Sequence, residues 1–109
     1  MEMNLAIDRL SALAHPARLA AFRLLIKAGA DGLPAGEIGR LTGVPPSTLS
    51  SQLAILERAG LTRSRREGRS ILYAADYTAM SALVAYLAQD CCAGAPEDCL
   101  PTTAFACPS

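Results

Sequence analysis

The segment from Glu37 to Leu61 constrains the fold of this chain more than any other. Its first part has apolar residues at helical spacing and stops at Gly43. After Val44-Pro45-Pro46, a second helical pattern ends at Gly60, a residue suited to a left-handed helix cap. Three leucines share one face of this second helix: Leu49, Leu53 and Leu56. Two helices joined by a tight glycine-containing turn form a helix-turn-helix arrangement.

The other face of the second helix carries small hydroxyl and amide side chains. These are Ser47, Thr48, Ser51 and Gln52. Such groups are suited to hydrogen bonds with phosphate oxygens and with base edges in a DNA major groove. The alternative is a small helical hairpin whose hydroxyls only face water. We interpret the second helix as a candidate reading helix.

The stretch that follows, from Leu61 to Tyr73, predicts a β-hairpin with Glu67-Gly68 as its turn. Four arginines are crowded near its tip: Arg63, Arg65, Arg66 and Arg69. A helix-turn-helix followed by a basic hairpin is a winged helix, whose arginines can neutralise phosphates or enter a minor groove. An arginine-rich hairpin could also be a solvated edge protected against aggregation. Both signals, adjacent and in this order, favour DNA binding.

The formal net charge of the 109-residue chain is zero, but the charges are unevenly distributed. From residue 40 to 72 there are six arginines against two glutamates, whereas from 73 to 109 there are four acidic residues and no Lys or Arg. The basic middle would face nucleic acid, and the acidic part would be repelled from it. We therefore expect the C-terminal part to serve another purpose.

Helices are predicted on both sides of these DNA-binding elements. The first covers residues 4–14, and a second begins at Pro16 and ends near Gly29. A loop over 30–33 follows, and Pro34 starts the short helix that supports the reading helix.

A final helix of about fourteen or fifteen residues follows Asp76, which is a plausible N-cap. It carries an apolar stripe of Met80, Leu83, Val84 and Leu87. Such a stripe is usually core, but on a terminal helix outside a small trihelical core it equally suits a dimer seam. We expect it to pair with its symmetry mate and with the first helix, which contributes Leu5.

Several function classes are disfavoured by the residues present. The N-terminus resembles no secretory signal, and the longest apolar run, 82–88, is too short to span a bilayer. We therefore expect a cytoplasmic protein without a membrane partner, in which four cysteines indicate metal or redox chemistry. An enzyme with a catalytic cofactor is not expected, because the chain has no phosphate loop or nucleophile motif. Its one histidine, His15, suits a helix junction, and Arg18 and Arg23 suit surface or dimer-side positions, with a phosphate contact as the alternative.

The order of these elements resembles the ArsR/SmtB family over roughly residues 5 to 92. The segments that carry the resemblance are LAHPARLAAFRLLI, EIGRLTGVPPSTLSSQLAILERAGL and SRREGRSILYA. Members of this family are dimeric winged-helix repressors that leave DNA when a metal or metalloid binds. The resemblance implies that the helix Pro46–Ala59 enters the major groove and that the arginine hairpin is the wing.

The family places its sensor sites variably. One arsenic-sensing type has a Cys-x-Cys motif before the reading helix, where residues 34–42 of this chain contain no cysteine. A zinc-sensing type uses Asp and His on the last helix, where residues 76–89 contain no histidine. A third type holds arsenic with an adjacent cysteine pair at the end of the last helix and a third cysteine shortly after. Cys91, Cys92 and Cys99 match that pattern, and Cys107 could substitute for the third ligand.

The chemistry of trivalent arsenic and antimony supports the same assignment. These soft centres form three bonds to thiolates in a pyramid, which a cysteine-bearing tail can supply. Zinc requires four tetrahedral ligands, and an adjacent pair is awkward for that geometry. The pair is also awkward for a disulfide, since neighbouring Cα atoms lie ~3.8 Å apart.

We therefore predict a mainly α winged helix-turn-helix with a β-hairpin, dimerising through its N- and C-terminal helices. Residues 1–92 would form the DNA-binding and dimerisation domain, and residues 93–109 a flexible cysteine-bearing tail. The predicted function is a homodimeric repressor of a metalloid-resistance operon, released from double-stranded operator DNA by As(III) or Sb(III) as inducer. The alternatives are a thiol redox-sensing repressor and an interaction module with a structural four-cysteine zinc tail.

Overall fold

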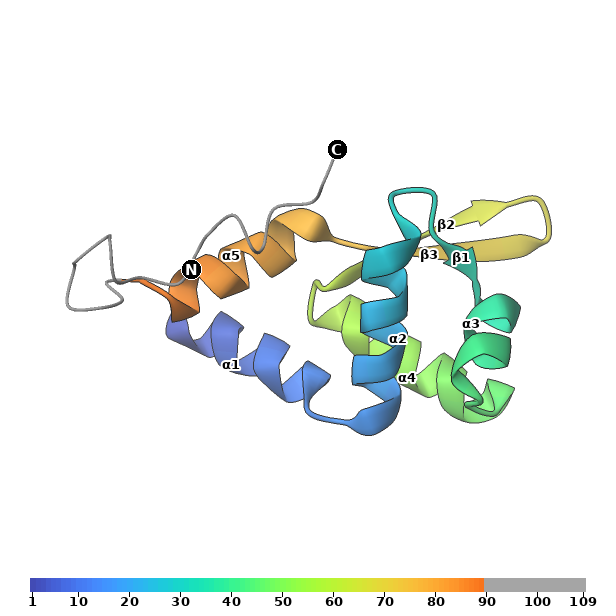
Figure 1. The fold of residues 1–109 in the computed structure, drawn as a ribbon, viewed down its shortest axis with the longest axis horizontal. Coiled ribbons are helices and arrows are strands. Elements are labelled where there is room, and N and C mark those ends of the chain that lie inside the picture. Colours follow the sequence, from blue (N-terminus) through green and yellow to red (C-terminus); the bar gives the residue numbers. More distant parts are fainter. Residues whose placement is uncertain (90–109) are drawn as a thin grey trace.

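A computed structural model of the chain describes residues 1–89. The predicted boundary at residue 92 and the tail 93–109 lie outside the described residues. The elements are α1 (Met3–Leu13), α2 (Pro16–Ala28), β1 (Leu33–Pro34), α3 (Ala35–Thr42), α4 (Pro46–Arg58), β2 (Thr62–Glu67), β3 (Ser70–Ala75) and α5 (Tyr77–Leu87). The predicted winged helix-turn-helix is confirmed: α3 and α4 form the helix pair, and β2 and β3 extend from it as the wing (Figure 1).

The core lies where α2, α3 and α4 meet under the sheet. Its fully buried aliphatic side chains include Leu25, Ile38, Leu49, Leu53, Leu56 and Leu61. The three leucines predicted to share one face of α4 are among them, which confirms that interpretation. Helices α1 and α5 lie side by side at one end of the molecule, beyond this core (Figure 1).

The sheet has three antiparallel strands in the order β1-β3-β2, one more than the predicted hairpin. Residue Leu33, predicted to be in a loop, pairs with Tyr73, and Pro34 ends the strand instead of starting α3. Gly32 permits this pairing: it has φ +74°, and a Cβ there would lie 2.3 Å from the carbonyl oxygen of Tyr73. The prediction failed because the partner strand lies far away in the sequence.

The wing turn lies one residue later than predicted. Glu67 pairs with Ser70, so the turn is Gly68-Arg69, with φ +64° at the glycine. Because strand side chains alternate between faces, the register places Arg63 and Arg65 on one face of β2 and Arg66 on the other.

Local signals located several helix ends correctly. The carboxylate of Asp76 accepts a hydrogen bond from the Ala79 amide at 3.0 Å, as its predicted N-cap role requires. Gly60 has φ +80°, as predicted for a residue that ends α4. His15 lies at the junction of α1 and α2, where its Nδ1 accepts from the Ala17 amide at 3.1 Å. The last helix is shorter than predicted, ending at Leu87 after 11 residues.

Candidate nucleic-acid interface

Helix α4 presents a polar surface opposite its buried leucines. Three of the four predicted reading residues, Ser47, Thr48 and Ser51, are exposed there. Their hydroxyls are small enough to let the helix backbone approach a groove closely. This part of the predicted site is brought together as a surface able to contact DNA.

The fourth predicted residue, Gln52, differs from the other three in its burial and in its partner. Its side chain is half-buried, and its Oε1 accepts a hydrogen bond from Arg18 Nη1 at 2.7 Å. It lies on the flank of α4 that faces α1 and α2 rather than on the outward face. Arg18, expected at the surface or beside a dimer partner, thus has a partner within the chain.

One exposed cation on α4 was missed by sequence reasoning. Arg58 lies in the last turn of the helix, and its guanidinium is directed back along it, with Nε 3.5 Å from the Ala54 carbonyl oxygen. It follows Ser51 by seven residues, which places both on one face. That spacing is the sequence signal that could have identified it.

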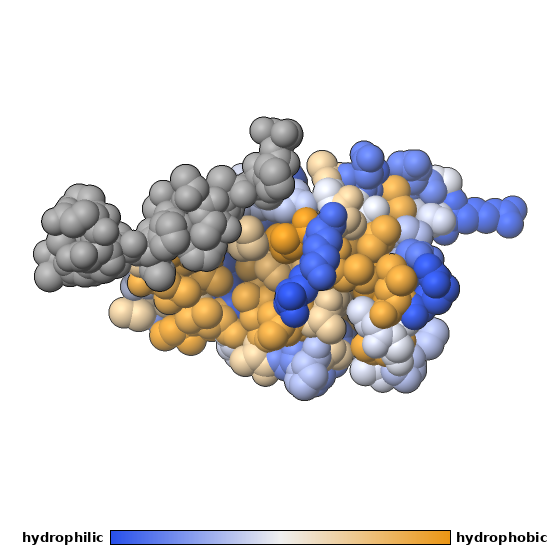
Figure 2. Space-filling model, in the orientation of Figure 1, coloured by the Kyte–Doolittle hydropathy of each residue, from blue (hydrophilic) through white to orange (hydrophobic). Residues whose placement is uncertain are grey.

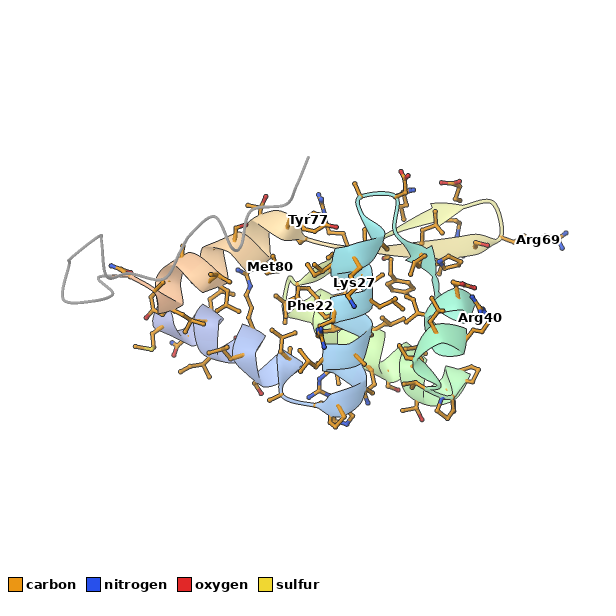
Figure 3. The ribbon with its side chains drawn as sticks, in the orientation of Figure 1. Phe22, Lys27, Arg40, Arg69, Tyr77 and Met80 are labelled. Atoms are coloured by element: carbon orange, nitrogen blue, oxygen red, sulfur yellow. The ribbon has the colours of Figure 1, made fainter. Side chains whose placement is uncertain are left out.

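The four wing arginines fall into two classes. Arg63 pairs with Asp76 at 3.8 Å, and Arg65 with Glu67 at 3.5 Å. Within residues 1–89, Arg66 and Arg69 make no ion pair. Arg69 points away from the body at the wing tip (Figure 3). The wing therefore has two cations engaged by carboxylates and two whose charge is not neutralised by a described partner.

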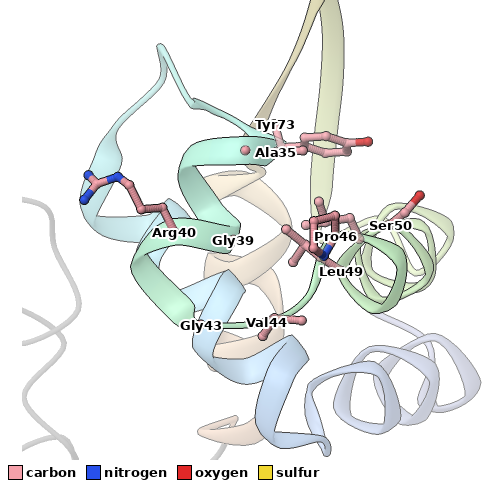
Figure 4. Close-up of a pocket in the computed structure, with 11 residues that line it drawn as sticks. Ala35, Gly39, Arg40, Gly43, Val44, Pro46, Leu49, Ser50 and Tyr73 are labelled. Atoms are coloured by element: carbon pink, nitrogen blue, oxygen red, sulfur yellow. The ribbon is translucent and has the colours of Figure 1, made fainter.

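A further arginine near α4 is also engaged. Arg40 of α3 donates hydrogen bonds to Glu37, which holds the pKa of that carboxyl below its usual value. Beside it lies an apolar hollow of about 370 Å³ between α3 and α4, bordered by Gly39, Leu49 and the ring of Tyr73 (Figure 4). The helix pair is thus less closely packed on this side than in the leucine core.

The predicted dimer residues differ in how much of each remains exposed. Leu83 is 4% exposed, so it packs within its own chain and offers little surface to a partner. Leu5 and Leu87 are 38% and 59% exposed, and Met80 and Val84 are half-buried. Further exposed apolar residues on α1, absent from the prediction, are Met3, Ile7 and Leu10. Apolar side chains gather at the end of the molecule formed by α1 and α5 (Figure 2).

The predicted metalloid ligands Cys91, Cys92 and Cys99, and the substitute Cys107, lie outside the described residues. Over residues 1–89, no three His, Cys, Asp or Glu side chains are grouped as metal ligands. None of the helices in that range combines the length and apolarity needed to cross a membrane.

Comparisons with known proteins match this geometry. A family model described as a helix-turn-helix domain matches residues 13–65. The HTH-type transcriptional regulator YgaV of Escherichia coli is 38% identical over 78 residues, covering 72% of this chain and 77% of that protein.

Solved structures also resemble this chain. HlyU from Vibrio cholerae is 33% identical with a TM-score of 0.64, over 80% of this chain and 97% of that one. A second structure, of reduced HlyU, has a TM-score of 0.65 at 29% identity, over 82% and 90%. The homodimeric winged helix-turn-helix domain of Mb0332 from Mycobacterium bovis, a possible ArsR-family regulator, has a TM-score of 0.64 at 28% identity, over 81% and 82%.

Proposed function

The chain belongs to the ArsR family of DNA-binding winged-helix transcriptional regulators, and from that premise we propose that it is a homodimeric repressor released from its operator by As(III) or Sb(III). The observation that carries the DNA contact is the exposed polar face of α4 beside a wing with Arg66 and Arg69 free of ion pairs within residues 1–89. Serine and threonine hydroxyls would contact base edges and phosphates, while the arginines would neutralise phosphates.

The exposed apolar side chains of α1 and α5 support assembly as a dimer. A monomer rarely leaves so many large apolar residues together in water, and a two-fold contact between these helices would cover them. A dimer would present two copies of α4, suited to two half-sites one turn of DNA apart. Mb0332, which shares this fold, is described as homodimeric.

The inducer assignment is supported by position and chemistry. Cys91 and Cys92 follow α5 after only three intervening residues, Ala88 to Asp90. With Cys99 they supply the three soft thiolates that a trivalent arsenic or antimony centre prefers. Binding there would act on α5, which contacts α1 through Tyr86, whose hydroxyl lies 3.6 Å from Met3 Sδ.

The inducer can release DNA only if the free and DNA-bound states of the dimer bind it with different affinity. A shift of α5 would move α1 and hence the dimer seam, which would change the spacing of the two α4 helices. The inducer would then bind more tightly to the free dimer, whose α4 spacing is not fixed by DNA.

A thiol redox switch is the second candidate, favoured by the similarity to HlyU, which was solved in a reduced form. A disulfide between Cys92 and Cys99 or Cys107 would replace the metalloid as the signal. Peroxide would then release the operator, and a reductant would restore binding.

One titration separates these proposals. As(III), Sb(III), Zn(II) and peroxide are added separately to the protein–operator complex, with the metal ions tested under strict reduction. We expect As(III) and Sb(III) to release the wild-type complex, and Cys91→Ser, Cys92→Ser or Cys99→Ser to abolish release with operator binding intact. Cys107→Ser is the matched control and should respond normally. Normal release by Cys92→Ser under reduction would refute the three-cysteine assignment, and release by peroxide alone would favour the redox switch.

A further inference from the structure

Arg18 connects three helices. From α2, its Nη1 donates to Gln52 Oε1 of α4 at 2.7 Å, and its Nη2 donates to the Ser11 carbonyl of α1 at 3.4 Å. Its Nε also donates to the carbonyl of Ala12. These carbonyls lie in the last turn of α1, where the helix supplies few donors, and the Ser11 carbonyl also accepts from the Ala14 amide at 3.1 Å. One planar guanidinium thus holds the end of α1 and the side of α4 together.

A second arginine attaches the same two helices at another point. Arg9 of α1 donates from Nε to the Ala59 carbonyl at the C-terminal end of α4, at 3.1 Å. Gln52 and Ala59 are seven residues apart, which is about 10 Å along a helix. Two attachments at that separation fix the angle between α1 and α4 as well as their distance.

Between the two attachments, the surface is hollowed. A hollow of about 340 Å³ lies there, bordered by Ala12, Ile55 and the two arginines Arg18 and Arg58. A gap of this kind forfeits the dispersion contacts that would otherwise hold two helices at one angle. The hydrogen bonds of Arg9 and Arg18 therefore add to the small apolar contact of Ala12 in setting that angle.

We propose that Arg18 and Gln52 are positioning residues that set the orientation of α4 relative to the dimerisation helices, and that Gln52 does not read bases. This inference rests on the proposed dimeric operator binding. Two reading helices engage one DNA face only if they lie about one helical turn, ~34 Å, apart. Loss of the Arg18–Gln52 contact would remove one of the two attachments between α1 and α4, so the dimerisation helices could turn relative to α4 about the Arg9–Ala59 contact. Operator binding would then weaken without loss of a DNA contact.

The test uses substitutions that separate charge from geometry. Arg18→Lys keeps the positive charge, but a single ammonium cannot reproduce the planar fork that reaches all three acceptors. Gln52→Met keeps the side-chain length and removes the acceptor. Arg23→Lys, an exposed arginine on the same helix, is the matched control. Operator duplexes are selected from a random library by the wild-type protein and by Gln52→Met, and each variant is titrated with the wild-type-selected duplex and a scrambled one.

We expect Arg18→Lys and Gln52→Met each to weaken operator binding by about tenfold or more, with little change on scrambled DNA. The double variant should be no weaker than the worse single variant, because both remove one interaction. Arg23→Lys should bind like wild type. Gln52→Glu, which keeps an acceptor for Arg18, should bind the operator more tightly than Gln52→Met despite its added negative charge.

Three results would overturn the inference. Wild-type affinity in Arg18→Lys would show that the planar fork of Arg18 positions nothing needed for binding, and a changed base preference in Gln52→Met would make Gln52 a base reader. Additive losses in the double variant would show independent roles. Thermal unfolding identifies a variant that fails to fold. If Arg18→Lys fails, the relative operator affinities of Gln52→Glu and Gln52→Met decide the test, and tighter binding by Gln52→Met would refute the inference. A wild-type protein that selects no duplex, or sediments as a monomer, would refute the proposed function instead.

Discussion

The two ends of this molecule differ in the side chains that stabilise their packing. The unit from α2 to β3 has a core of fully buried aliphatic side chains such as Leu25, Ile38 and Leu53. The layer of α1 and α5 buries mainly alanines, Ala6 and Ala79 among them. Its helix α1 meets α4 beside a hollow, through the Arg9–Ala59 hydrogen bond and through Arg18 of α2, which bonds both helices. Large aliphatic side chains make many more dispersion contacts than alanines do. The DNA-binding unit should therefore resist deformation more than its contact with the outer layer does.

Leu53→Ala should have the largest effect, because it acts on the packed unit. Its side chain is fully buried, and truncation leaves a cavity, so we expect a loss of about 3 kcal/mol in the free energy of unfolding. Chemical denaturation followed by circular dichroism measures this. Leu41→Ala, an exposed leucine on α3, is the control and should change stability little. Similar losses of stability in both variants would contradict a special role of the buried core around Leu53.

Leu87→Glu tests the outer layer and should act on assembly. Leu87 is 59% exposed in the single chain, so a glutamate there costs a monomer little. In a two-fold seam it would bury an unpaired carboxylate, at a cost of about 3 kcal/mol or more. We expect monomers in sedimentation, with the folded DNA-binding unit retained. Gln89→Glu, an exposed change past the end of α5, is the control; equal dissociation by both would remove Leu87 from the seam.

The smallest effect on structure is expected in the wing. Arg66→Ala with Arg69→Ala should leave both unfolding and dimerisation unchanged, since neither arginine has an ion-pair partner among residues 1–89. Binding to all duplexes should weaken, and the slope of log affinity against log salt should fall by about 2, one for each lost phosphate contact. Arg63→Ala, which removes a cation already paired with Asp76, should change the slope less. An unchanged slope in the double variant would exclude the wing from the footprint.

Features that depend on neighbouring residues were predictable from the sequence. The buried leucines of α4 follow from helical periodicity, and the cap roles of Asp76 and Gly60 follow from their chemistry. Each of these signals operates within a few residues of the position it describes.

Features set by distant partners were not predictable in this way. The strand at Leu33 exists because it pairs with Tyr73, and the position of Gln52 depends on Arg18, 34 residues away. Periodicity placed Leu83 and Leu87 on one stripe but could not tell that Leu83 is buried within the chain and Leu87 is exposed. The division between paired and unpaired wing arginines likewise depended on the strand register and on Asp76.

The hydroxyl of Tyr77 gives α5 a fixed end. It donates to the Ile26 carbonyl in the last turn of α2 at 2.8 Å, so the first residue of α5 is tied to the packed unit. From this pivot the helix extends to Leu87, about 15 Å away at 1.5 Å per residue. A rotation of α5 by a few degrees displaces its far end by about 1 Å and leaves the pivot in place. Any such rotation therefore displaces α5 most at Leu87, the end from which the sequence continues to the cysteines.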